Sequence, residues 1–115
     1  MNPRLHAALQ AWGRSDFAQV LCDELQRQDA LFAPLQRAIE HGSQALVDRA
    51  VPMLLHGAQD ADTLQVDVAI SYSSITPGCA CEADPTPMSE LPEFATLRIR
   101  IRRDTAEATL RVLDN

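Results

Sequence analysis

Hydrophobic and polar residues alternate with a period of two in two stretches of the second half of the chain. The first stretch is LQVDVAISY, residues 64–72, in which every second residue is large and apolar. The second is ATLRIRIRR, residues 95–103, in which leucine or isoleucine alternates with arginine. Because successive side chains of a strand point to opposite faces, this pattern is typical of a strand that is buried on one face. Both stretches are therefore predicted to be β-strands.

A hairpin is predicted at the carboxyl-terminal end of the chain. Ala108, Leu110 and Val112 alternate with polar residues in a third stretch. The four residues 103–106 are enough to turn the chain between the second and the third strand. The two strands would then share one apolar face and one face in water, as antiparallel pairs commonly do.

The first half of the chain shows helical spacing instead. Apolar residues recur three or four positions apart over residues 3–12 and again over residues 15–28, which predicts two amphipathic helices. Residues 30–41 fit either a third helix, with Pro34 in its first turn, or a loop followed by a short strand.

The order of these elements predicts an α+β fold. Pro52 interrupts the apolar run that follows the helices, and proline is tolerated at the edge of a sheet, so residues 47–56 are predicted to form an edge strand. We expect a two-layer sandwich, with N-terminal helices packed on one face of a three- or four-stranded antiparallel sheet. The chain is interpreted as a single domain, residues 1–115, with a helical half over about 1–45 and a sheet half over about 46–115.

Composition narrows the class of protein. The chain has 115 residues and a net charge of −6, from ten basic residues, all arginine, and sixteen acidic ones. This balance disfavours a general attraction to nucleic acid or to an anionic membrane. No apolar run approaches the ~18 residues that cross a bilayer. The first residues lack the apolar core of a signal peptide, and three cysteines do not make a secreted disulfide framework. A cytoplasmic bacterial protein is expected.

A segment of unusual composition separates the predicted strands. Residues 77–93 hold four prolines and four acidic residues but no basic residue. An irregular connection of this length in a small domain is usually functional, and its acidic residues, Glu90 and Glu93 included, are expected to be solvated. The contact site for a partner or a ligand is therefore predicted at residues 77–87. Its candidate residues are Gly78, Cys79, Cys81, Glu82 and Asp84.

Cys79 and Cys81 allow three interpretations. Two thiolates one residue apart can hold one ion of the zinc or copper type, with Asp84 or Glu82 as an oxygen ligand. The same pair can form a strained, reducible disulfide. Free cysteines also pack simply as small hydrophobic residues, which is the plainest of the three interpretations.

The remaining cysteine and the histidines share no motif. Cys22 lies beside an apolar helical stripe and is expected to be a buried thiol. His6 is expected to face solvent, His41 to lie near a helix end and His56 to lie in a turn. Cys22, His41 or His56 could also complete a metal site with the cysteine pair.

Four arginines are predicted to project from the polar face of the sheet: Arg98, Arg100, Arg102 and Arg111. Such a stripe could bind an anion, either nucleic acid or an acidic partner. Residues 97–112 contain no aromatic residue on which a base could stack, so nucleic acid is disfavoured. Asp67 and Glu107 are expected to neutralise part of the stripe, which makes a solvated outer face the simpler interpretation.

The sequences GCACEADPT and EFATLRIRIRRDTAEATLRVL resemble those of a group of small bacterial proteins of unknown function. Six residues match the loop pattern of that group: Gly78, Cys79, Cys81, Asp84, Pro85 and Thr86. The chain departs from the pattern at Ala83, where the group has an acid, and at Ala95, where it has a third cysteine. The resemblance implies no activity, and the missing thiol weakens the metal interpretation.

These features together predict a binding module that is not an enzyme and that contacts a protein or a small ligand through residues 77–87. The alternative is a metal-binding protein that uses Cys79 and Cys81 with Asp84 as a further ligand. A third interpretation is a small enzyme with one of these two cysteines as its reactive thiol.

Overall fold

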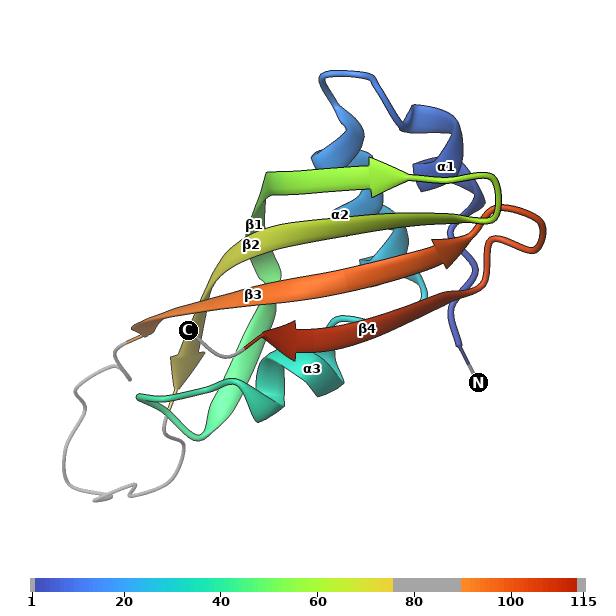
Figure 1. Cartoon of the computed structure of the whole chain (residues 1–115). Coiled ribbons are helices and arrows are strands. Elements are labelled where there is room, and N and C mark those ends of the chain that lie inside the picture. The colour runs from blue at the N-terminus through green and yellow to red at the C-terminus, as the bar shows by residue number, and fades with distance from the viewer. Residues whose placement is uncertain (1, 76–89, 114–115) are drawn as a thin grey trace, which may run out of the picture.

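Three short helices precede a four-stranded sheet in this chain (Figure 1). The computed structural model describes residues 2–75 and 90–113. The helices are α1 (His6–Ala11), α2 (Phe17–Arg27) and α3 (Phe32–Arg37). The strands are β1 (Gln44–Gln59), β2 (Thr63–Ile75), β3 (Leu91–Arg102) and β4 (Ala108–Leu113). They lie side by side in sequence order, and every neighbouring pair is antiparallel.

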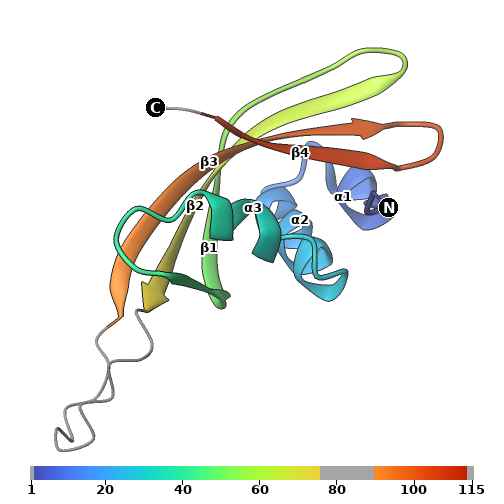
Figure 2. The same ribbon diagram turned by 90° about the horizontal axis from the view of Figure 1, so that it is seen from below.

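All three helices lie against the same face of the sheet (Figure 2). We call this the inner face, and we call the opposite one, which the described helices leave uncovered, the outer face. The arrangement confirms the predicted α+β fold with two layers.

The inner face supplies most of the hydrophobic core. Seven of its large side chains are no more than 1% exposed: Leu64, Val66, Val68, Ile70, Leu97, Ile99 and Ile101. The apolar stripe of α2, which includes Phe17, Leu21 and Leu25, is buried against them in the same cluster. Alternation with a period of two therefore predicted both these strands and the face that they bury.

The first helix begins later than its spacing predicts. Residues 3–5 are extended because the carbonyl oxygen of Pro3 accepts a hydrogen bond from the backbone N–H of Ala108 at 2.8 Å. The N–H of Leu5 donates to the carbonyl oxygen of Ala106, also at 2.8 Å. The segment before the helix thus pairs with the start of β4 and cannot join the helix.

Residues 30–41, which fit either a helix or a loop followed by a short strand, contain the helix α3. Pro34 lies in the first turn of α3, where its missing N–H leaves no intrahelical bond unmade. The helix ends at Arg37, four residues short of the predicted end. No helix in the described ranges has the length and apolar character needed to cross a membrane.

Strand β1 is an edge strand, as predicted, but it extends beyond residues 47–56 at both ends. Its register with β2 shifts between Leu46 and Val51 and again between Leu54 and His56. Such irregularities bend a strand, and Figure 1 shows β1 turning sharply along its length. Pro52, which cannot donate to a ladder, lies in this edge strand.

The connection between β2 and β3 is shorter than predicted. Residues 91–93 were expected in an irregular loop that extends from residue 77 to residue 93. They lie in β3, where Leu91 pairs with Ser74 and Glu93 pairs with Tyr72.

Candidate functional site

The residues predicted to form the contact or metal site lie outside the described residues. They are Gly78, Cys79, Cys81, Glu82 and Asp84, and the roles assigned to them stay predictions.

The structure does place both ends of the segment that contains them. Strand β2 ends at Ile75 and β3 begins at Leu91. We call the adjoining part of these strands, residues 69–75 and 91–96, the loop end of the sheet. The remaining part, residues 63–68 and 97–102, is the hairpin end.

A buried carboxylate lies on the inner face at the loop end. Glu93 is only 6% exposed. Its two oxygens accept hydrogen bonds from the backbone N–H groups of Glu40, His41 and Gly42 at 3.0, 3.0 and 3.2 Å. The hydroxyl of Ser74 donates a fourth at 2.6 Å. Burial by itself raises the pKa of Glu93, but these four donors outweigh it and lower the pKa to about 2.

The residues around Glu93 pack closely and form a further hydrogen bond. At Gly42, a Cβ atom would come within 2.8 Å of the Cβ of Ser74 and 2.9 Å of the carbonyl oxygen of Ile75, so a side chain does not fit there. The hydroxyl of Tyr72 donates to the carbonyl oxygen of Leu35 at 2.8 Å. Burial, together with the charges of Glu93 and Glu40, raises the pKa of Tyr72 to about 12. This polar cluster joins α3 and the chain after it to the loop end.

Glu93 contradicts the prediction of a solvated acidic residue. Its three backbone donors lie more than fifty positions away in the sequence, so no local pattern predicts them. A signal was nevertheless present, because the alternation that starts at Leu97 places Ala95 and then Glu93 on the same inner face when it is continued toward the amino terminus.

The outer face at the loop end exposes hydrophobic side chains. Val51 pairs with Ser71 and Met53 pairs with Ala69, so both point to the outer face. Phe94 also faces outward, opposite Ser71. The exposed fractions of Val51, Met53 and Phe94 are 62%, 63% and 54%. We call these three residues the outer apolar cluster.

Small residues lie between the members of this cluster. Ala69 and Thr96 pair with each other in the middle of the sheet and are only 4% and 8% exposed. The exposed apolar surface here therefore belongs to the three large side chains of the cluster. Exposed apolar side chains of this size offer contacts to another molecule.

The outer face at the hairpin end carries the predicted arginine stripe. Arg98, Arg100, Arg102 and Arg111 share this face, as their register shows. Asp67 accepts two hydrogen bonds from the guanidinium of Arg98, at 2.9 and 3.1 Å. This contact lowers the pKa of Asp67 and raises that of Arg98. The predicted neutralisation by Asp67 is confirmed.

Glu107 acts on the stripe as predicted, although it forms no ion pair with it: after the contact with Asp104, the charge of Glu107 helps to raise the pKa of Arg102. The carboxylate of Glu107 accepts a hydrogen bond from the side-chain amide of Asn2 at 3.0 Å. Arg102 instead forms an ion pair with Asp104 in the turn that follows it, at 3.2 Å.

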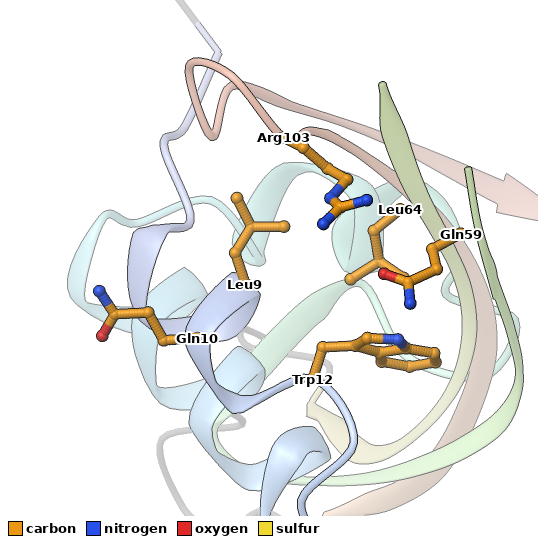
Figure 3. Close-up of a pocket in the computed structure, with 6 residues that line it drawn as sticks. All are labelled: Leu9, Gln10, Trp12, Gln59, Leu64 and Arg103. Carbon is orange, nitrogen blue, oxygen red and sulfur yellow. The ribbon is translucent and has the colours of Figure 1, made fainter. Parts of the chain in front are cut away.

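A hollow of about 280 Å³ lies between α1 and the turns at the hairpin end (Figure 3). Its lining residues are Leu9, Gln10, Trp12, Gln59, Leu64 and Arg103. Figure 3 shows Trp12 and Leu64 on its wall, whereas Gln10 points away. Trp12 also stacks edge to face with Phe17, with ring centroids 5.1 Å apart. The guanidinium of Arg103, between β3 and β4, donates to the carbonyl oxygen of Asp60, between β1 and β2, at 2.8 Å. This hydrogen bond joins the two turns at the hairpin end.

The described cysteine and the histidines occupy separate places. Cys22 is buried, as predicted, and burial together with the charge of Asp23 raises its pKa to about 11. His6 is exposed, as predicted. His56 was expected in a turn but lies within β1, opposite Asp67. His41 lies beyond the end of α3, where its N–H binds Glu93.

Among residues 2–75 and 90–113, no three side chains of histidine, cysteine, aspartate or glutamate are close enough together to hold a metal ion. Comparisons with protein-family models, with curated proteins and with solved structures found no match.

Proposed function

We propose that this chain is an interaction module that binds a partner protein through the outer face of its sheet, at the loop end. The observation that carries the proposal is an inversion of the usual pattern. Two consecutive residues of β3, Glu93 and Phe94, place the carboxylate inside and the aromatic ring in water. An exposed aromatic residue does not stabilise the fold by burial, and large exposed apolar side chains mark interaction surfaces.

The position of the cluster supports the same proposal. Phe94 is only three residues from Leu91, where the connection from β2 enters β3. The segment predicted to contact a partner, residues 77–87, lies within that connection. A partner on the outer apolar cluster would therefore be close to the point where this segment joins the sheet.

The hydrogen bonds of the loop end also support it. Glu93 fixes the inner side of β3 through four hydrogen bonds, directly next to Phe94. A side chain on a fixed backbone loses less conformational freedom when it binds, so more of the contact energy appears as affinity.

Selection of short random peptides on the immobilised protein tests the proposal. Phe94→Ala and Met53→Ala should each weaken the selected peptides by about thirtyfold, the loss expected when a central apolar anchor is truncated. Phe32→Ala is the matched control, since Phe32 is an exposed aromatic residue on the helical layer. Peptides whose affinity survives the double substitution of Phe94 and Met53 would contradict the proposal.

A further inference from the structure

The arginines of the outer face are arranged at a cost in stability. Arg98 of β3 lies directly opposite Arg111 of β4. Like charges at directly opposed positions of an antiparallel pair destabilise the sheet. Arg100 lies two positions along β3 from Arg98 and faces the same way. Three positive charges thus gather on neighbouring strands.

Acidic residues offset only part of this charge. Asp67 pairs with Arg98 and Asp104 pairs with Arg102. Within residues 2–75 and 90–113, no carboxylate comes within 4.0 Å of the guanidinium groups of Arg100 or Arg111. The chain as a whole has a net charge of −6, so this positive patch is a local feature.

The patch adjoins the outer apolar cluster. On the outer face of β3, Phe94 is followed by Thr96, Arg98 and Arg100. Side chains two residues apart on one face are separated by about 7 Å, so Arg98 lies roughly 13 Å from Phe94 along the strand. Apolar and basic contacts are therefore available within the reach of one short segment of a partner.

We infer that the partner presents an acidic amphipathic segment, in which carboxylates lie about 13 to 20 Å from an apolar anchor. This inference rests on the proposed function: the anchor occupies the outer apolar cluster, and the carboxylates bind the guanidinium groups of Arg100 and Arg111. Arginine suits this role because its planar fork binds a carboxylate with two hydrogen bonds. A carboxylate there also relieves the repulsion between Arg98 and Arg111.

A protein segment fits this surface better than nucleic acid does. A phosphate backbone would use the arginines but would leave the apolar cluster without a partner. An acidic amphipathic segment uses both halves of the surface.

The test makes two double substitutions in the protein, each of which removes two positive charges. It compares the affinities of the two variants for the peptides selected above. Arg100→Gln with Arg111→Gln should weaken binding at least about tenfold, since both substitutions remove charge-assisted hydrogen bonds to the carboxylates of the peptide. Arg14→Gln with Arg27→Gln, on exposed arginines of the helical layer, should change it less than about twofold, as distant surface charges are screened. The selected peptides should be enriched in aspartate and glutamate, and replacing these by asparagine and glutamine should reproduce the loss.

Two results would overturn the inference, and they differ from a failure of the proposed function. Neutral peptides that need Phe94 but are indifferent to Arg100 and Arg111 would refute the acidic partner and leave the interaction surface standing. Single-stranded RNA that binds through these arginines, while no acidic peptide does, would assign the patch to nucleic acid. Peptides that depend on neither Phe94 nor Met53 would refute the proposed function itself.

Discussion

The two ends of the sheet distribute polarity in opposite ways. At the hairpin end, Leu97 and Ile99 are fully buried while Arg98 and Arg100 reach water. At the loop end of the same strand, Glu93 is buried and Phe94 is exposed. The alternation of side chains continues unbroken through both ends, so the geometry of the strand is the same. Only the chemistry that the sequence assigns to each face has changed.

The difference shows where the distribution of apolar and polar side chains serves the stability of the fold and where it does not. The hairpin end follows the rule that apolar groups leave water, which is the main source of stability. The loop end departs from that rule at two adjacent residues, the buried Glu93 and the exposed Phe94. Only at Glu93 do hydrogen bonds offset the cost of the departure. Glu93 has four hydrogen-bond donors, whereas Phe94 lines a hollow beside Ile39 and Val112 but keeps 54% of its surface exposed. Residues that break the rule of apolar burial without a benefit to the fold are expected at functional sites.

Truncating one apolar residue at each end gives the sharpest test of this comparison. Leu97→Ala should cost about 3 kcal/mol of unfolding free energy, because it removes a fully buried side chain and leaves a cavity. Phe94→Ala should change the unfolding free energy by no more than about 0.5 kcal/mol, as exposed surface substitutions do. Chemical denaturation of both variants measures the difference. Equal losses would mean that Phe94 belongs to the core and not to an interface.

Acid should weaken the loop end selectively. The pKa of Glu93 falls from an ordinary value of 4.5 to about 2 on folding. Its contribution to stability is therefore complete above pH 4.5 and is lost as the pH falls toward 2, an effect of about 3 kcal/mol.

The variant Glu93→Gln isolates this contribution. It should be less stable than the wild type at neutral pH and should lose its disadvantage as the pH approaches 2. Asp60, Asp67 and Asp104, whose pKa values are also lowered, are common to both proteins and cancel in the difference. Denaturant titrations at a series of pH values measure it. If the difference in unfolding free energy between the two proteins stayed constant across this pH range, the charge of Glu93 would not contribute to stability.

The sequence was informative where the contrast between neighbouring residues was strong. Leu97 to Arg102 alternate between branched aliphatic and charged side chains, so the strand, its buried face and the arginine stripe could all be predicted. Glu93 lies in a stretch rich in proline and acids, which is typical of a loop, and its three backbone donors come from residues 40–42. Periodicity can assign Glu93 to the inner face, but it gives no sign of donors so distant in the sequence.

The outer apolar cluster was missed for a related reason. Val51 and Met53 lie on a strand whose register shifts twice, so their face cannot be obtained by counting from a neighbour. Phe94 could have been placed outside by continuing the alternation backward from Leu97. The predicted contact residues Cys79 and Cys81 lie outside the described residues, and their role stays a prediction.

The smallest effect concerns the two ion pairs of the arginine stripe. Asp67 is largely buried beside Arg98 and holds it with two hydrogen bonds, whereas Asp104 and Arg102 are both well exposed. Asp67→Asn should therefore cost up to about 1 kcal/mol of unfolding free energy, and Asp104→Asn close to nothing, since exposed pairs contribute little. Asp67→Asn should also strengthen the binding of acidic peptides, because it releases Arg98 and removes one negative charge from the surface that they contact. Weaker peptide binding in this variant would mean that Asp67 orients Arg98 for the partner and does not compete with it.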